Sequence, residues 1–248
     1  MSKIWKFRRK VTHLCSYERD PLCLSGVNYP RNDGDFTALC EVTVNETPVP
    51  YAVDLGLPSG LKWASFNLGA SKPEELGNYY AWGETMPKQM YDWTTYKWFA
   101  GDPFQTESTL TKYCTISSKG YNGFTDRKTV LDPEDDVAHV ALGGNWRMPE
   151  YYEFEELRTM CTWKWTSMNG VNGCTFTGPN GSSIFLPAAG HRFKDDVVSS
   201  SSSGYYWSSS LYDKNPYLPW HLVFSSDQVQ RDHWYRRCYG FSIRPVSE

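Results

Sequence analysis

Three segments near the end of the chain determine the predicted fold: GYYWSSS at residues 204–210, HLVF at residues 221–224 and YGFSIRPV at residues 239–246. Short runs of aromatic and branched residues between turn residues predict β-strands. Two polar, aromatic-rich connections, residues 211–220 and 225–238, lie between these segments. The pattern predicts a strand framework that carries two displayed loops.

Strand parity divides the middle segment between core and surface. Successive side chains of a strand point to opposite faces of its sheet. If Leu222 and Phe224 face the core, His221, Val223 and Ser225 point outward. We therefore expect the outward positions to vary without disturbing the core.

The last segment follows the same rule. Phe241 and Ile243 are expected to face inward, and Ser242 and Arg244 outward. Arg244 and Arg147 lie inside glycine- and aromatic-rich framework motifs. We expect both arginines to bind loop carbonyls or a carboxylate rather than a ligand.

The two connections collect residue types that proteins use for recognition. Trp, Tyr and Arg dominate binding energetics, and Asp and Asn tips set hydrogen-bonding specificity. The predicted ligand-binding residues are Tyr212, Asp213, Asn215, Tyr217, Trp220, His221, Asp227, Gln228, Asp232, His233, Trp234, Tyr235 and Arg236. In the alternative interpretation, Trp220 and Trp234 fill the core and the other residues form an ordinary loop.

Length and charge limit the classes of function. A chain of 248 residues buries roughly 70–75% of its extended surface as one domain, so it needs neither a disulfide nor a metal for stability. The formal net charge is -3, and the basic residues gather only in a short cluster within residues 3–10. The sequence therefore argues against nucleic-acid binding, which depends on an extended basic face.

The sequence predicts no membrane span, because no run reaches about 18 apolar residues. The start, MSKIWKFRRKVTHLC, has the charges of a signal peptide but lacks an apolar region of about 7–15 residues. We expect a phage particle or a cell surface as the location if a leader has been removed, and the cytoplasm otherwise.

Cysteine spacing favours reduced thiols. The seven cysteines include no C-x-x-C pair, which argues against a zinc ribbon or a thioredoxin-type site. Cys15 with Cys23, or Cys161 with Cys174, would form a disulfide only in an oxidising compartment.

Composition divides the chain near residue 50. Residues 1–50 form a predicted N-terminal appendage with one strand, FTALCEVTV, before the prolines at 48 and 50. It is either an oligomerisation arm or a simple extension packed on the main domain. Residues 51–248 form the predicted main domain, a long series of short elements separated by Gly, Pro and Ser.

Two helices are predicted in the main domain. For the first, Asp132 suits the N-cap and Pro133 the first helical position, before a Gly-Gly pair ends the helix. Val137, Val140 and Ala141 are expected to share its buried face. The second helix begins at Pro149 and continues through YYEFEELRTMC. With strands predicted at YAVDLGL, at SIFLPAAG and in the last segments, the chain is predicted to be α+β with mainly antiparallel sheets.

Several motifs, in order, resemble a known family. They are VDLGLPSGLKWASFNLGA from residue 53, GNYYAWGE from 77, GGNWRMPEYYEFEEL from 143, GPNGSSIFLPAAGHR from 178, GYYWSSS from 204 and GFSIRPV from 240. These segments are similar to the paralogous domains of Bacteroidetes and Fibrobacter that share the C-type-lectin-like fold. The resemblance covers residues 51–246 and implies small sheets whose first and last strands pair.

The same resemblance implies kinship with the variable proteins of diversity-generating retroelements, whose diversified C-terminal residues bind ligands. In those proteins diversification replaces adenines in the coding sequence. Replacing the adenines of an AAY codon never yields Lys, Gln or Trp. Lys214, Gln228, Gln230, Trp220 and Trp234 must therefore be fixed or arise from other codons. A second implied kinship is with the formylglycine-generating enzymes, which use a cysteine pair near the end of the domain, where this chain has Cys238 alone.

The sequence predicts no cofactor, no metal and no enzymatic activity. A calcium-dependent lectin site needs several hard oxygen ligands, and the densest carboxylates, Asp132 and residues 134–136, are explained by a helix start. Cys238 is expected to be an exposed, varied side chain. The favoured function is binding of a protein or glycan ligand on a cell surface by a phage-associated protein. A cell-envelope adhesin or structural domain is the alternative, and a formylglycine-type oxidase the third hypothesis.

Overall fold

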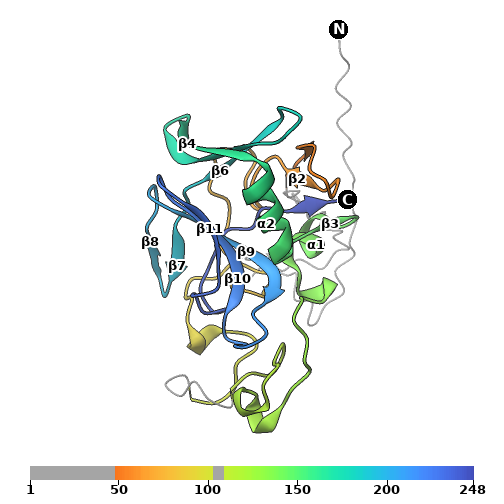
Figure 1. Ribbon diagram of the computed structural model, residues 1–248. Coiled ribbons are helices and arrows are strands. Elements are labelled where there is room, and N and C mark those ends of the chain that lie inside the picture. The colour runs from red at the N-terminus through yellow and green to blue at the C-terminus, as the bar shows by residue number, and fades with distance from the viewer. Residues whose placement is uncertain (1–47, 103–108) are drawn as a thin grey trace, which may run out of the picture. The chain divides into compact units, whose positions relative to one another are not determined.

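The computed structural model describes residues 48–102 and 109–248, in which short strands form four small antiparallel sheets with two α-helices (Figure 1). This arrangement confirms the predicted α+β class. The rest of the predicted appendage, including its strand, Cys15, Cys23 and Cys40, lies outside the described residues. Three strands form the central sheet in the order β11-β10-β9. They are β9 (Gly204–Leu211), β10 (Pro219–Phe224) and β11 (Val229–Asp232).

Two of the three framework segments are strands, and the third is mostly irregular. Every residue of β9 is buried, and β10 pairs with it antiparallel, with Leu222 opposite Tyr206. In the last segment only β12 (Val246–Ser247) is a strand. The residues before it form single bridges to several parts of the chain, such as Phe241 to Tyr80.

The first and last strands of the domain share a sheet without pairing directly. The order is β1-β2-β12-β3, so β2 lies between them and the expected pairing of the terminal strands is wrong. The strands are β1 (Ala52–Asp54), β2 (Lys62–Ala64) and β3 (Trp146–Arg147), with β12 as given above.

A third sheet has the strand order β4-β5-β6. The sequence predicts only its last strand. It consists of β4 (Thr162–Met168), β5 (Val171–Thr177) and β6 (Ser183–Pro187). Asn169 and Gly170 join the first two strands with φ angles of 49° and 84°. An Asn-Gly pair with two positive φ angles is the favoured two-residue hairpin turn. A separate hairpin pairs β7 (His191–Phe193) with β8 (Asp196–Val198).

The first helix begins later than predicted. A 3-10 turn, Pro133–Asp135, precedes α1 (Val137–Leu142), and the side chain of Asp136 caps α1 by accepting the N–H groups of Ala138 and His139. This later start turns Val137 and Ala138 toward the core and leaves Val140 52% exposed. The predicted buried face that included Val140 and Ala141 is therefore wrong.

The second helix, α2 (Tyr151–Met160), begins near the predicted position. Glu150 and Glu153 form a capping box at its start, and Phe154 and Leu157 are buried. The remaining helical elements are single 3-10 turns, Trp93–Thr95, Ser117–Lys119 and Tyr121–Gly123. None of the described helices is long and apolar enough to cross a membrane.

Apart from Arg237 and Arg244, the largest fully buried side chains among the described residues are all aromatic. Trp63 packs against Phe154 between α2 and the sheets, with ring centroids 5.5 Å apart. Trp207 stacks on Phe241 at 3.9 Å. The first contact joins β2 to α2, and the second joins β9 to the irregular last segment.

Arg244 is fully buried, although parity predicted that it faces outward. Its guanidinium donates to Asn67 Oδ1 and to the carbonyls of Ala64 and Phe185. Burial lowers the pKa of Arg244 to about 10. Ser242 is also buried, because the last segment runs through the interior instead of along an open sheet. The expected structural role of Arg244 is confirmed, and the predicted orientation is wrong.

Arg237 is a second fully buried arginine. Its guanidinium donates to the carbonyls of Lys112, Tyr113 and Pro216 and to the hydroxyl of Tyr96. Buried carbonyls need such partners because these irregular segments lack sheet neighbours. Arg237 therefore holds the loops around residues 96 and 112 against the last connection.

Replacing Arg237 by Met is expected to lower the free energy of unfolding by more than about 3 kcal/mol. The change leaves three buried carbonyls without this donor, and each unsatisfied group costs about 1–3 kcal/mol. Urea denaturation of the full chain measures the effect. The neighbouring Arg236→Met variant is the control, since Arg236 is exposed and exposed substitutions change stability by about 0.5 kcal/mol or less. Equal stability of the two variants would contradict the role of Arg237.

Candidate binding surface

Exposed and half-buried rings from α2, from β10 and from the two connections contact one another. Tyr151 and Tyr152 begin α2, Trp220 lies on β10, and the others belong to the two connections. We call the following set the aromatic surface: Tyr151, Tyr152, Tyr212, Trp220, His233 and Trp234.

Ring contacts link the whole aromatic surface. Tyr151 stacks on Trp220 with centroids 5.5 Å apart, and Trp220 also contacts His233 at 4.5 Å. Tyr212 lies 4.1 Å from His233, which in turn stacks on Trp234 at 5.7 Å with an interplanar angle of 13°. Each ring is thus supported by a neighbour, which reduces the conformational entropy lost on binding.

Exposure differs along the aromatic surface. Trp234 is 74% exposed and Tyr152 is 50% exposed, whereas Trp220 is half-buried. The alternative interpretation, in which both tryptophans fill the core, is therefore wrong for Trp234. An exposed tryptophan that rests on other rings is a typical anchor of a binding site.

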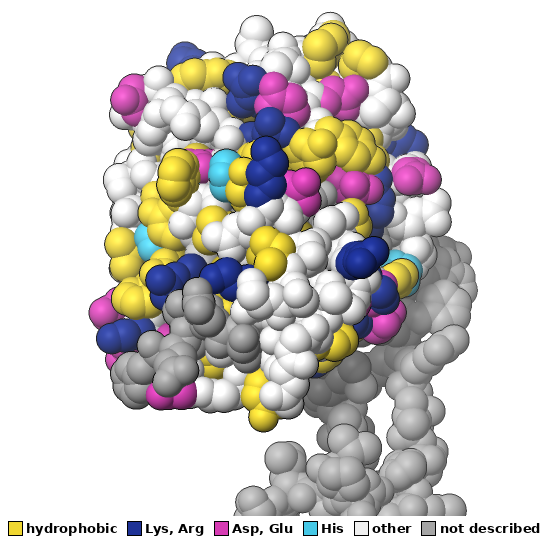
Figure 2. All heavy atoms as spheres, turned by 60° about the horizontal axis from the view of Figure 1, so that its bottom comes forward, with side chains coloured by type: hydrophobic (Ala, Val, Ile, Leu, Met, Phe, Trp, Pro, Cys, Tyr) yellow, Lys and Arg dark blue, Asp and Glu magenta, His cyan; other side chains and the backbone are white. Residues whose placement is uncertain are grey.

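Polar residues lie in the same two connections as the rings. Asp213 and Arg236 are exposed, and Asn215 and Asp232 are half-buried. Asp227 and Gln228 are also exposed but lie in the turn between β10 and β11, at the other end of this hairpin from Trp220 and His233. Figure 2 shows a face of the molecule on which hydrophobic side chains lie beside basic, acidic and histidine side chains instead of forming one continuous apolar patch. Such alternation supplies both stacking faces and hydrogen-bonding groups.

Two predicted binding residues are buried. Tyr217 is only 7% exposed, and its ring packs edge-on against Trp93 at 5.5 Å. His221 is fully buried, because the other side of β10 is covered by Trp207 and Phe241. Parity predicted correctly that His221 and Leu222 lie on opposite faces, but both faces of this strand are covered.

Tyr235 belongs to a mixed aromatic cluster below the surface. Its ring is half-buried and contacts Tyr205, His191 and Phe241 at 5.2, 4.9 and 5.4 Å. Burial is the main cause that raises the pKa of Tyr235 above its ordinary value. Tyr235 thus supports the second connection more than it presents a free face to a ligand.

His191 and His221 are neutral in this cluster. Burial lowers the pKa of His191 to about 4 and that of His221 to about 3. His191 Nδ1 and His221 Nε2 are buried and have no hydrogen-bond partner among the described residues. His221 Nδ1 lies 3.4 Å from the carbonyl oxygen of Pro219, but burial outweighs this contact and keeps the imidazole neutral.

Cys238 is buried, contrary to the expectation of an exposed, varied thiol. It is 1% exposed, and burial raises its pKa to about 12. Cys114, Cys161, Cys174 and Cys238 are all free thiols, so the pairing of Cys161 with Cys174 is not formed. A thiol with such a high pKa is a poor nucleophile and metal ligand.

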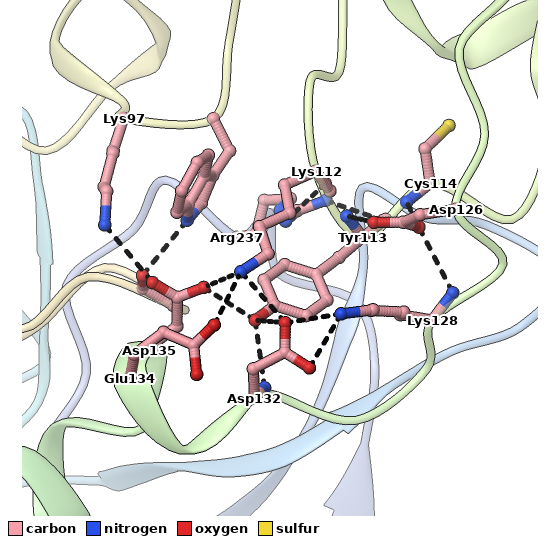
Figure 3. Close-up of polar contacts among 12 residues, drawn as sticks. Lys97, Lys112, Tyr113, Cys114, Asp126, Lys128, Asp132, Glu134, Asp135 and Arg237 are labelled. Carbon is pink, nitrogen blue, oxygen red and sulfur yellow. Dashed lines mark hydrogen bonds and ion pairs between the residues drawn. The ribbon is translucent and has the colours of Figure 1, made fainter.

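The acidic cluster before α1 is occupied by lysine. Carboxylate oxygens of Asp132, Glu134 and Asp135 lie within 4.8 Å of one another. Lys112 Nζ lies among them, 2.9 Å from Asp132 Oδ2 and 2.5 Å from Asp135 Oδ2 (Figure 3). Burial would raise the pKa of Asp135, but hydrogen bonds from Lys112, Tyr113 and Lys97 hold it below its ordinary value. The ammonium group takes the place that a metal ion would need.

Two small cavities, of about 160 and 180 Å³, are lined by other residues. One includes Asp136 and His139, and the other includes Ile184 and Phe185. Neither is lined by a residue of the aromatic surface. Both are smaller than the about 300 Å³ at which pockets for drug-sized ligands begin.

No protein-family model, curated protein or solved structure matches the chain.

The sequence patterns do not indicate Tyr151 and Tyr152, which begin a helix expected to support the core. They also do not indicate Arg231, which lies beside the aromatic surface with its guanidinium carbon 4.6 Å from the ring centroid of Trp220. The tyrosine pair carried a usable signal, because two adjacent residues cannot both face the core from the first turn of a helix. The position of Arg231 depends on the register of β11 with β10, in which it lies opposite Leu222.

Replacing His221 by Phe is expected to weaken the pH dependence of stability. A buried histidine with a lowered pKa contributes stability that is present above its ordinary pKa near 6.5 and is lost as the pH falls toward the folded value. His221 and His191 each make the free energy of unfolding fall by about 1.4 kcal/mol per pH unit well below pH 6.5.

Chemical denaturation of the full chain at several pH values between 6.5 and 5 measures this slope. The His221→Phe variant should lose the contribution of one histidine, and His191→Phe should lose a similar amount. A parent and variants with identical slopes would contradict burial of neutral histidines at both positions.

Proposed function

We propose that the chain is a ligand-binding protein, with the aromatic surface as its binding face, on a scaffold of C-type-lectin-like fold. The observation that carries the proposal is the continuous set of ring contacts that ends in the 74% exposed Trp234. A solvated tryptophan with an open face gains free energy when a ligand covers it. The ordered motifs in residues 51–246 and the small antiparallel sheets support the proposed scaffold.

The division between framework and surface supports a displayed, variable binding face. On the central sheet, β9 is buried throughout, while Asp213 and Arg236 in the connections are exposed. Substitutions at these exposed positions leave the core contacts intact. This is the arrangement that a variable protein of a diversity-generating retroelement requires, and we include that kinship in the proposal.

The ligand is proposed to be a protein or glycan on a cell surface, met either from a phage particle or from the surface of another cell. A cell-envelope adhesin would use the same rings and differs only in where the chain is displayed. The oxidase hypothesis gains no support from Cys238, because that thiol is buried and has a raised pKa.

Replacing Trp234 by Ala is expected to weaken binding by about 2 kcal/mol or more, the loss typical of a hot spot. The melting temperature should hardly change, since the ring is mostly solvated. The full-length parent and its variants are labelled and titrated onto intact bacterial cells and onto a printed glycan array. They are compared on each surface to which the parent binds.

Trp163→Ala is the matched control for this experiment. Trp163 is also exposed, at 37%, but belongs to β4 and lies outside the aromatic surface. Its variant should bind as the parent does. Unchanged binding by Trp234→Ala together with a large fall in its melting temperature would contradict the proposed binding face.

A further inference from the structure

Arg231 lies beside the aromatic surface with its guanidinium held by two rings. Its central carbon is 4.6 Å from the centroid of Trp220 and 4.9 Å from that of Tyr151. A guanidinium that rests on aromatic faces is attracted by their π-electrons. The two rings therefore fix the position of the charge while they leave its hydrogen-bonding edge unused.

The donors of Arg231 are not satisfied within the described residues. Its side chain makes no hydrogen bond there, and its buried Nε has no hydrogen-bond partner. The ion pair with Glu155 is long, with 3.9 Å between Nε and Oε2, and so falls outside hydrogen-bond distance. The side chain keeps 28% of its surface exposed, which leaves it open to a ligand.

Glu155 is already paired with another arginine. Arg158 reaches it through two nitrogens, at 2.6 Å from Oε1 and 3.2 Å from Oε2. The hydrogen bonds from Arg158 are the main cause that holds the pKa of Glu155 below its ordinary value, and the more distant charge of Arg231 adds to it. Glu155 therefore stays charged, with Arg158 as its hydrogen-bonded partner. Arg231 remains a positive charge with free donors beside exposed rings.

An arginine in this state is preorganised for a carboxylate. The planar guanidinium presents parallel N–H donors that match the two oxygens of a carboxylate. Because the rings already restrict the side chain, little further entropy is lost when the ion pair forms.

The chemistry of the exposed rings favours a sugar over a protein as the source of that carboxylate. Tyr151, Tyr152 and Trp234, at 36%, 50% and 74% exposure, present open aromatic rings beside the charged Arg231. Pyranose rings have apolar C–H faces that stack on such rings, and their hydroxyl groups suit the carboxylates of Asp213 and Asp232 in the two connections.

We propose that the aromatic surface binds an acidic glycan, with the carboxylate of a uronic or sialic acid unit paired to Arg231 and neighbouring sugar rings stacked on the exposed aromatic side chains. This inference rests on the proposed binding function and names its ligand class. It assigns Arg231 as the residue that distinguishes acidic from neutral sugars.

The test uses the full chain on a printed array that holds uronic-acid, sialylated and neutral oligosaccharides. The strongest acidic binder is then titrated in solution beside its carboxyl-reduced form, in which the carboxylate has become a primary alcohol. The parent should bind the reduced form at least about tenfold more weakly, the loss of one charge-assisted pair.

Arg231→Gln should bind the acidic glycan about tenfold more weakly than the parent does. It should show little preference between the acidic glycan and its carboxyl-reduced form. This double-mutant cycle separates the ion pair from general damage to the surface. Arg231→Lys should recover part of the preference for the acidic glycan, because lysine keeps the positive charge but lacks the two parallel N–H donors of a guanidinium. Arg127→Gln, at an exposed position outside the aromatic surface, is the control and should behave as the parent.

Two outcomes would overturn the inference and leave the proposed function standing. Equal binding of acidic and carboxyl-reduced glycans, with no effect of Arg231→Gln, would show that the carboxylate is not recognised. Binding to cells that depends on Trp234 but to no glycan on the array would show a protein ligand. If neither cells nor glycans are bound in a Trp234-dependent way, the proposed function itself fails.

Discussion

Two buried guanidinium groups hold the irregular parts of this domain together. Arg244 binds two carbonyls and Asn67, and Arg237 binds three carbonyls and Tyr96. Much of the chain is neither helix nor strand, so many backbone carbonyls have no sheet or helix partner and must be satisfied otherwise. One arginine side chain carries several N–H donors, so it can bind carbonyls of segments that are more than 100 residues away from it along the chain.

The aromatic surface, which we propose as the binding face, depends on this internal support. The second connection contains Trp234 at the surface and Arg237 in the interior, three residues further along. The same short segment is therefore fixed at one end and presented at the other. Trp220 and His233 lie between the buried sheet and the exposed ring of Trp234, so the surface is supported from below before any ligand arrives.

Motifs and strand patterns predicted the α+β class, the central strands and the second helix, because local composition determines these elements. Parity failed at His221, where both faces of β10 are covered, since parity distinguishes two faces but not whether each faces solvent. It does not apply to Arg244, Cys238 and Tyr217, which lie outside the strands, where the packing of the whole domain decides burial. Arg231 depends on the β10-β11 register and on contacts with α2, which no local pattern contains.

The central claim is that exposed connection residues vary while the residues that anchor them do not. Sequencing the gene and its downstream DNA in several isolates of the source organism tests this most directly. We expect changes concentrated at exposed or half-buried positions such as Tyr212, Asp213 and His233, constant codons at Arg237 and Arg244, and a near-copy of the coding segment for residues 204–248 beside a reverse transcriptase gene. Variation spread evenly over buried and exposed positions, with no such copy, would contradict the account.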